Sequence, residues 1–548
     1  SATSLIDTGI TPDFDANPPE EAADFSASGD YPGVIGAFQQ RVLVAGTTNE
    51  PATVQASRVA APDDFTVSSP LQDTDAVSWT MVGAQRVRVL HFLEIERQLL
   101  MFTTVGVVAV GGDDTGILAP GAVTPIRLSG TGAARYPGPL EVGRSALFVQ
   151  ARGSVVHDVR DDGGDDLTLT GAHLVEGYTI VDWCFQETPH PIIWVVRSDG
   201  VLLSLTYERS TGVLAWARHD TAGSAVGTVE AVACVAEATE DAVYLVVQRT
   251  INGGTVRYLE RLASTVAAAA SLVLADCAVQ ATGPHPHSGL SLDLTSALYS
   301  VPTNTTGGIV ATGSGGSGSF ASTDVGRTFS FVRSDTTYTA TITAYTSPTV
   351  VTISFVGSAS GWTNPTAITT ANWWWTSLGG LSHLENETVS VVLDGAVHAS
   401  PNNPTVETVV TVDNGVALLA NTTPFTAAVV GLPITADLRT LALDTSRQTA
   451  RDKNFNITQV GLIVEESFGC WLGQEPPDAD DEVTGLDELE TLDSDGNAAT
   501  SAQTGYREAL ITAAWSVEAG SIFLRHVDPV PLTVHAIVPH GHFPSARA

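Results

Sequence analysis

Apolar and polar residues alternate along much of the first half of the chain, and small groups of turn residues interrupt the alternation. The stretch IIWVVRSDGVLLSLTYERSTGVLAWARHDT at 192–221 is an example, with turn residues at 198–200 and again at 210–212. Alternation with a period of two is typical of β-strands, and Gly, Asp and Ser between two such runs favour tight turns. This stretch therefore predicts consecutive β-hairpins.

The pattern recurs in five loosely similar blocks between residues 34 and 262. The blocks begin near residues 33, 87, 140, 179 and 229, which is a spacing of roughly 40 to 55 residues. Each block has room for three or four short strands, the content of one β-propeller blade. We therefore predict an all-β fold with an irregular β-propeller-like large domain. Its first part covers 30–282 and follows an N-terminal extended segment at 1–29.

The composition changes after residue 282. Residues 283–319 are rich in Gly, Ser and Thr, and the Lys and helix that a phosphate-binding loop needs do not follow, so we expect a flexible connection. Residues 320–378 alternate again and predict a small inserted β-barrel. Of Trp373, Trp374 and Trp375 we expect one or two in the barrel core and at least one against the adjacent domain, because neighbours on a strand face opposite sides.

The last part of the chain, 379–548, predicts a continuation of the propeller-like domain and a C-terminal β region. An acidic, proline-containing stretch at 474–497 interrupts it and predicts a long loop that is solvated or mobile. The formal net charge of the chain is −35 at pH 7, and Lys453 is the only lysine. Such a surface repels nucleic acid phosphates, so we expect no grip on DNA, although contact without grip is compatible with it.

Residues that could carry out chemistry are few. The cysteines are far apart in the sequence, and we expect buried free thiols in a protein made in a reducing cytosol; they are Cys184, Cys234, Cys277 and Cys470. No apolar run reaches about 18 residues, which predicts a soluble protein without a membrane-spanning segment. Because the first residue is Ser1, we expect that residues upstream have been removed.

No catalytic motif is present, and GRSAL at 143–147 lacks the second glycine of a nucleophile elbow. We predict no enzymatic activity, no catalytic residues and no cofactor. DSDGN at 493–497 resembles part of a calcium loop without its full spacing. Two pairs of histidines at i and i+2 could share a metal on a strand, but such pairs are usually solvated and we expect no metal site; they are His285 with His287 and His540 with His542.

Several strings taken together are more specific than any of these motifs. DYPGVIGAFQQRVLVAGTTNEPATVQASRVAAPDDF, DDLTLTGAHLVEGYTIVDW, WVVRSDGVLLSLTYE, LENETVSVVLDGAV and VVGLPITADLRTL follow in this order. They resemble the tail nozzle, or tail hub, proteins of short-tailed bacteriophages over most of the chain. The 320–378 segment looks like the small β-barrel often found in that family, a likeness of fold that implies no activity.

The resemblance implies a structural protein of the virion tail that is assembled in the host cytoplasm. Members of the family form a homo-oligomeric ring of about six copies below the portal and adaptor rings. The ring forms the DNA channel, retains the genomic double-stranded DNA, conducts it during ejection without specific binding, and supports tail fibres or spikes. Two alternatives are a monomeric β-propeller that binds glycans and a hydrolase built on a propeller.

On the nozzle interpretation the negative charge has a use, because an acidic lumen lets DNA slide where a basic one would clamp it. Screening acts over about 8 Å at physiological salt, so only carboxylates near a narrow lumen would matter. The alternative is that the acidic loop is solvated on the outside and serves solubility. The candidate residues at the channel or its mouth are Asp478, Asp480, Asp481, Glu482, Asp487, Glu488 and Glu490.

Overall fold

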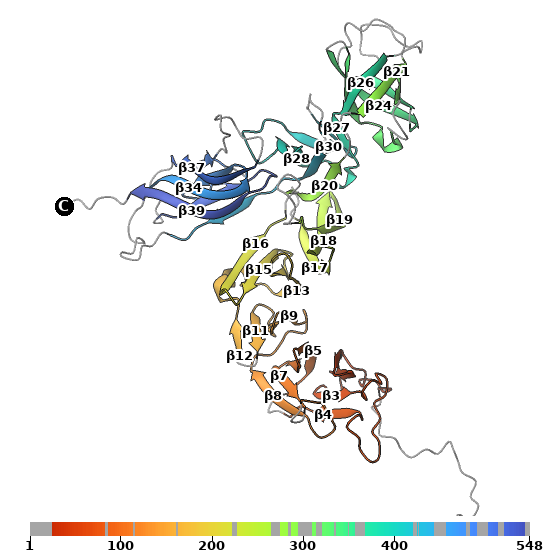
Figure 1. Ribbon diagram of the computed structural model, residues 1–548, viewed down its shortest axis with the longest axis vertical. Coiled ribbons are helices and arrows are strands. Elements are labelled where there is room, and N and C mark those ends of the chain that lie inside the picture. Colours follow the sequence, from red (N-terminus) through yellow and green to blue (C-terminus); the bar gives the residue numbers. More distant parts are fainter. Residues whose placement is uncertain are drawn as a thin grey trace, which may run out of the picture. The chain divides into compact units, whose positions relative to one another are not determined.

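The structure, a computed structural model, is built almost entirely of β-strands (Figure 1). The chain divides into two compact units: unit 1 comprises 1–219 and 229–243, and unit 2 comprises 220–228 and 244–548. No helix in the described ranges is long and apolar enough to cross a membrane. The residues that the structure describes are 25–82, 86–112, 116–160, 163–221, 227–264, 274–282, 287–293, 309–313, 320–333, 336–348, 350–356, 368–419, 425, 427–442, 456–477, 483–489, 502–512 and 520–542.

Five antiparallel sheets, which we number 1 to 5, follow one another along the first half of the chain. In each of them the strands pair in sequence order, as in a propeller blade. The strands are β1 (Val34–Phe38), β2 (Arg41–Ala45), β3 (Thr53–Ala56) and β4 (Val77–Thr80) in sheet 1; β5 (Val89–Ile95), β6 (Gln98–Thr103), β7 (Gly106–Gly111) and β8 (Thr124–Ser129) in sheet 2; β9 (Leu140–Val142), β10 (Ser145–Val149), β11 (Val156–Arg160) and β12 (Gly163–Asp166) in sheet 3; β13 (Ile180–Gln186), β14 (Ile192–Arg197), β15 (Leu202–Glu208) and β16 (Val213–His219) in sheet 4; and β17 (Thr228–Ala236), β18 (Asp241–Ile251) and β19 (Gly254–Arg261) in sheet 5.

Each predicted block forms one of these sheets, and each sheet begins within two residues of the predicted block start. The hairpins predicted at 192–221 are strands β14, β15 and β16, paired antiparallel. Gly200 and Gly212 in the two turns have φ values of 84° and 74°, a region that glycine enters without the steric cost of a Cβ. The predicted all-β, propeller-like fold is confirmed.

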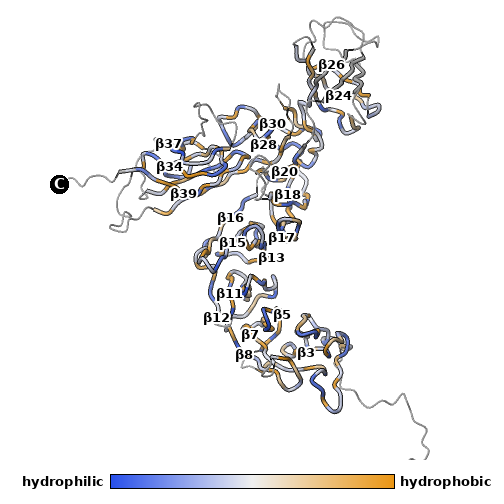
Figure 2. The backbone as a smooth tube through the Cα atoms, in the orientation of Figure 1, coloured by the Kyte–Doolittle hydropathy of each residue, from blue (hydrophilic) through white to orange (hydrophobic). Residues whose placement is uncertain are grey.

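The central strands of sheets 2, 3 and 4 are buried on both faces, so they are more apolar than simple alternation predicts. On β6, Leu99 and Met101 pack in a cluster with residues of sheet 1. Leu100 and Phe102 point the other way and pack with residues of sheet 3, where the rings of Phe102 and Phe148 lie 5.4 Å apart. Figure 2 shows hydrophobic residues in every one of these sheets. Sheets 1 to 4 are thus held together, each to the next, by apolar contacts.

Unit 2 contains a seven-stranded sheet and a closed six-stranded barrel that interrupts it (Figure 1). The strands of the large sheet are β20 (Asp276–Thr282), β27 (Ser377–Gly379), β28 (Thr388–Leu393), β29 (Ala396–Ala399), β30 (Val410–Asp413), β31 (Val416–Leu418) and β32 (Ala427–Leu432). The barrel consists of β21 (His287–Asp293), β22 (Ile309–Gly313), β23 (Thr328–Arg333), β24 (Thr336–Ser347), β25 (Val350–Phe355) and β26 (Ile368–Trp375). Because the chain enters the barrel after β20 and leaves it before β27, the barrel is an insertion.

The predicted boundaries of the barrel are wrong at the N-terminal side. Residues 283–319 were expected to be a flexible connection, but they contain β21 and β22, which close the barrel between β26 and β25. β22 is only five residues long, and the Gly- and Ser-rich stretch 314–319 follows it directly. Its alternation is therefore too short to be recognised in the sequence. The described barrel therefore extends from 287 to 375 and not from 320 to 378.

All three tryptophans at the end of β26 are buried. Trp373 and Trp375 belong to a hydrophobic cluster with Phe320, Phe329 and other barrel residues, which confirms the expected core role. Trp374, on the opposite side of the strand, is only 3% exposed. The guanidinium of Arg327 lies 3.7 Å from the centre of the Trp375 ring, a cation–π contact.

Unit 2 contains two further sheets whose strands do not pair in sequence order. Their strands are β33 (Ala436–Arg439), β35 (Cys470–Gly473), β36 (Asp487–Leu489) and β38 (Phe523–His526) in one sheet, and β34 (Asn456–Ser467), β37 (Gln503–Leu510) and β39 (Thr533–His542) in the other. That 379–548 continues the propeller-like domain stays a prediction. The described helices are short; they are α1 (Ala172–Val175) and the 3-10 turns η1 (Leu169–Gly171), η3 (Ser322–Asp324) and η4 (Ser382–Leu384).

Candidate functional site

The acidic segment predicted at 474–497 is described only in part. Asp487 and Glu488 lie in β36. The other five predicted residues lie outside the described residues; they are Asp478, Asp480, Asp481, Glu482 and Glu490. The fragment 493–497 and His285 also lie outside them.

The described part of this segment is folded and not a solvated loop. Residues 483–489 end in β36, which pairs with β35 so that Glu488 lies opposite Trp471. Val483 and Leu486 are buried in a cluster with Trp471. These two apolar residues lie between acidic residues of the sequence and anchor residues 483–489. The expectation of a solvated or mobile loop is therefore wrong for residues 483–489.

The carboxylate of Asp487 has a structural partner. It accepts hydrogen bonds from the backbone N–H and the hydroxyl of Thr512, both at 2.7 Å. Asp487 therefore ties β36 to the end of β37, and its charge is used locally. The channel hypothesis then depends on the five acidic residues outside the described part and on Glu488.

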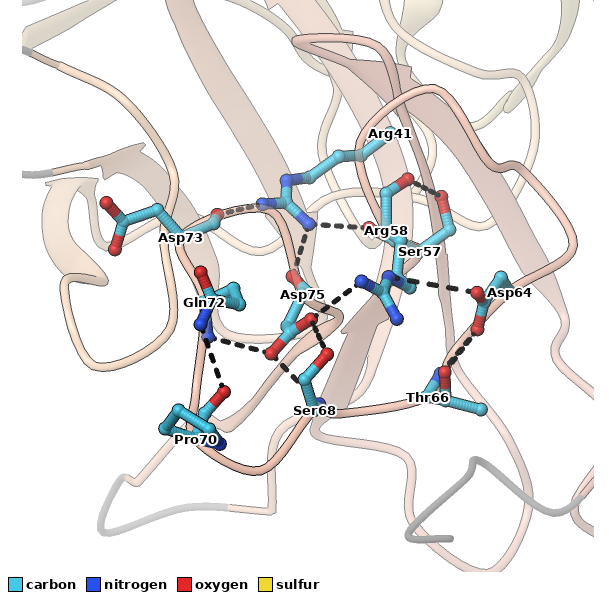
Figure 3. A network of polar contacts seen from close by, with 10 residues as sticks. All are labelled: Arg41, Ser57, Arg58, Asp64, Thr66, Ser68, Pro70, Gln72, Asp73 and Asp75. Atoms are coloured by element: carbon cyan, nitrogen blue, oxygen red, sulfur yellow. Dashed lines mark hydrogen bonds and ion pairs between the residues drawn. The ribbon is translucent and has the colours of Figure 1, made fainter.

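A second polar site, which the sequence analysis missed, lies in sheet 1 (Figure 3). Residues 57–76 form a long loop between β3 and β4. The side chain of Arg41, only 2% exposed, reaches this loop from β2 and donates hydrogen bonds to three backbone carbonyls. The acceptors are the oxygens of Ser57 at 2.7 Å, Asp73 at 2.8 Å and Asp75 at 2.6 Å.

The carboxylate of Asp75 holds the same loop from within. It accepts hydrogen bonds from the backbone N–H and hydroxyl of Ser68 at 2.9 and 2.8 Å and from the backbone N–H of Gln72 at 2.8 Å. The guanidinium of Arg58 forms an ion pair with it at 3.0 Å. Figure 3 shows Arg41 and Asp75 side by side, each contacting a different part of the loop. We call this arrangement the loop network.

The charges of the loop network are tuned by burial and hydrogen bonding. Burial lowers the pKa of Arg41, and the nearby Asp75 carboxylate offsets this in part. Burial on its own would raise the pKa of Asp75, but the hydrogen bonds from Gln72 and Ser68 outweigh it, so the pKa lies below the usual value. The network therefore keeps Asp75 ionised, which suits a structural clamp and not a proton donor.

The network presents a defined loop surface to solvent. Val67 and Leu71 in the loop are 37% and 56% exposed, although both are hydrophobic. The sequence does contain a signal for this site, because Arg41 is the only charged residue in the apolar strand RVLVA. A charged side chain in a buried strand needs polar partners, and the long turn-rich segment after β3 can supply them. The loop is a candidate contact surface whose shape is fixed in advance.

A third polar arrangement joins sheets 3 and 4. Asp158 on β11 is 1% exposed and accepts hydrogen bonds from the hydroxyl of Tyr207 on β15 and, at 2.9 Å, from Arg209. Burial and the Asp158 carboxylate raise the pKa of Tyr207. The indole N–H of Trp183 on β13 donates to the carbonyl of Gly138 at 2.6 Å. These hydrogen bonds fix the orientation of the two sheets, which the apolar contacts alone do not specify.

Several carboxylates in the described part of the chain have lowered pKa values because of local hydrogen bonds. Asp64, Asp75, Asp199 and Glu208 all have pKa values below the usual range, because each accepts hydrogen bonds from neighbouring side-chain or backbone groups. Within the described ranges no group of three or more His, Cys, Asp or Glu is placed to hold a metal ion. Of the predicted histidine pairs, His540 lies with its Nε2 3.3 Å from the hydroxyl of Tyr506.

Comparison with known proteins gives no identification. The chain matches no protein-family model and no curated protein sequence. The resemblance to tail nozzle proteins therefore remains an interpretation of the sequence strings.

Proposed function

We propose that this protein is a structural component of a short-tailed phage tail, one copy of a ring-shaped nozzle below the portal and its adaptor. The observation that carries the proposal is the series of sheets 1 to 4 in unit 1, in which each sheet shares an apolar cluster with the next. Strings on which the resemblance rests form parts of this series: 30–65 contains β1 to β3, and 165–183 leads into β13. A body of this kind is stiff, and a ring needs a stiff subunit with two different contact surfaces.

The charge of the chain supports the same role. With a net charge of −35, the protein has little means to grip DNA, because binding a duplex requires cationic side chains. A conduit for a genome has to enclose DNA without holding it. The loop network fits an assembly role as well, since a loop fixed before association loses little conformational entropy on binding.

The test is the mass of the purified protein in solution, measured by native mass spectrometry, alone and then mixed with the portal and adaptor of the same virion. We expect a ring of about six copies, formed either alone or only on that platform. A protein that stays monomeric in both experiments and does not join the complex contradicts the proposal. Glycan binding by that monomer would instead support the alternative of a propeller-like glycan-binding protein.

A further inference from the structure

Two cysteines that are far apart in the sequence meet where sheets 4 and 5 adjoin. Cys184 lies on β13 and Cys234 on β17, 50 residues later. Their sulfur atoms are 2.6 Å apart, closer than ordinary non-bonded contact. Cys277 and Cys470 lie on β20 and β35, in other sheets.

Other contacts align the two strands on either side of the sulfur pair. The backbone N–H of Val232 donates to the carboxylate of Asp182 at 3.0 Å, two residues before each cysteine. Two residues after Cys184, the side-chain amide of Gln186 donates to the backbone carbonyl of Asp241 at 2.8 Å. Asp182, Cys184 and Gln186 alternate along β13 and therefore share the face that meets sheet 5.

A further clamp closes the end of this seam. The carboxylate of Asp241 accepts hydrogen bonds from the backbone N–H groups of Glu187 and Thr188, both at 2.9 Å. The approach of the two sulfurs is thus supported by at least four hydrogen bonds that involve neither cysteine. Such support matters because a disulfide forms without strain only where the backbone already brings the two residues together.

The two thiols differ in access to solvent. Cys184 is 9% exposed, whereas Cys234 is only partly buried. The adjacent Cys234 sulfur and burial both raise the pKa of Cys184. A small oxidant in solution would therefore react first at Cys234, and Cys184 would act as the resolving thiol.

We propose that Cys184 and Cys234 form a disulfide site, a covalent clasp between sheets 4 and 5 that a small-molecule disulfide closes. The thiolate of Cys234 attacks one sulfur of the small disulfide, forms a mixed disulfide and releases one small thiolate. The sulfur of Cys184 then attacks the Cys234 sulfur and displaces the second small thiolate. The two protons of the cysteine thiols end on the two small thiols, so two cysteines are oxidised as one small disulfide is reduced.

The test uses the full-length protein and oxidised glutathione. After treatment, the remaining thiols are alkylated under denaturing conditions, and unreduced peptides are mapped by mass spectrometry. We expect two thiols lost out of the four, a mass lower by two hydrogen atoms before alkylation, and a peptide pair that links residue 184 to residue 234. Cys234→Ser should abolish the link, whereas the matched control Cys277→Ser should leave it intact.

Three results would overturn the inference: four free thiols after full equilibration, a stable glutathione adduct on Cys234 without a link, or links that join different chains. The cross-linked peptide is sought in the unmodified protein, so a variant that fails to fold does not decide the outcome. As a second measurement, the oxidised protein should unfold at a temperature about 5 °C or more above the reduced protein, because the bond closes a long loop in the unfolded chain. Cys234→Ser should show no such difference, and the test does not depend on the proposed nozzle function.

Discussion

At the scale of single residues, the stability of the long loop in sheet 1 depends on two opposite charges with separate tasks. Arg41 serves three backbone carbonyls, and Asp75 serves backbone N–H groups and hydroxyls of the same loop. Loop backbone groups are usually satisfied by water. Here the two side chains bond five backbone groups of the loop, which holds it in place although many of its residues are exposed.

Replacing Arg41 with methionine keeps most of the aliphatic volume and removes every donor. We expect Arg41→Met to lower the free energy of unfolding of unit 1 by about 3 kcal/mol, because three carbonyl oxygens lose a buried partner. Hydrogen exchange of peptides from 57–76 should also become faster. Denaturant unfolding combined with hydrogen exchange mass spectrometry measures both effects.

The matched control for this change is Arg144→Met. Arg144 is 79% exposed in its side chain and forms an exposed ion pair with Glu96, so its loss should cost no more than about 0.5 kcal/mol. Equal effects of the two substitutions would contradict the role given to Arg41. Unchanged exchange in 57–76 would do so as well.

A second prediction at this scale concerns pH. His526 on β38 is 6% exposed, with its Nε2 2.6 Å from the carbonyl of Val530, and burial lowers its pKa despite that contact. A histidine whose pKa is lower in the folded state stabilises the fold above its unfolded value of about 6.5, and this contribution is lost as the pH falls below it. We expect unit 2 to lose stability between about pH 7 and pH 5, with at most about 1.4 kcal/mol per pH unit from this residue.

His526→Gln should make this pH dependence shallower, since glutamine does not titrate. Urea unfolding across the pH range, followed through hydrogen exchange of peptides from β38, gives the two slopes. The control is His535→Gln, because that side chain is 54% exposed and its substitution removes an exposed ion pair with Glu465, which contributes little. A slope that is identical in the wild type and in His526→Gln would contradict the assignment.

At the scale of elements, the prediction from the sequence succeeded where the hydrophobic pattern was long and regular. The five sheets begin where the blocks begin because each block contains its own turns and pairs only with itself, so local information specifies it. The barrel is different. β21 and β22 pair with β25 and β26, which are distant in sequence, and their short runs are separated by Gly- and Ser-rich stretches that mask the period.

This correction gives a prediction about the barrel. A fragment covering 283–376 contains all six strands. A fragment covering 320–378 lacks β21 and β22, so β25 keeps only β24 as a partner, β26 keeps only β23, and the barrel cannot close. We expect the longer fragment to unfold cooperatively on heating and the shorter one to show no cooperative transition, because open sheet edges leave backbone groups unpaired. Tryptophan fluorescence reports the burial of Trp373 and its neighbours.

Circular dichroism melting of the two fragments is the comparison to make, at equal concentration and with the oligomeric state checked. A cooperative transition in the fragment 320–378 would mean that four strands suffice. The closure seen with β21 and β22 would then add little to the stability of the barrel.

The candidate sites were predictable only in part, for a related reason. Composition marked the acidic segment, but the roles of Val483, Leu486 and Asp487 depend on contacts with β35 and β37 that no local pattern encodes. The pairing of Cys184 with Cys234 depends on two strands from different blocks lying side by side. Spacing in the sequence gives no sign of such contacts, and for that reason the sequence predicts buried free thiols.

At the scale of the whole molecule, the question is whether the position of the negative charge matters for function or only its total amount. If the charge serves solubility, its location is unimportant and any surface carboxylate contributes equally. If it serves a DNA channel, only carboxylates within about 8 Å of the passing phosphates act at physiological salt, and their effect grows as salt is lowered. The two cases differ in salt dependence, which makes them separable in a virion.

The structure sharpens the experiment by showing which carboxylate to leave in place. Asp487 holds Thr512, so its neutralisation would disturb β36 itself. We therefore leave Asp487 and its β36 neighbour Glu488 in place and neutralise the other five with the amide variants Asp478→Asn, Asp480→Asn, Asp481→Asn, Glu482→Gln and Glu490→Gln. On the channel hypothesis, virions with these changes should eject DNA more slowly than the wild type at low salt and approach the wild-type rate at high salt.

The control neutralises an equal number of exposed carboxylates in unit 1, such as Asp63 and Glu141, and should leave the ejection rate unchanged. Equal ejection rates at every salt concentration would assign the acidic segment to the outer surface and leave the nozzle proposal itself standing, since that proposal is decided by ring formation on the portal and adaptor.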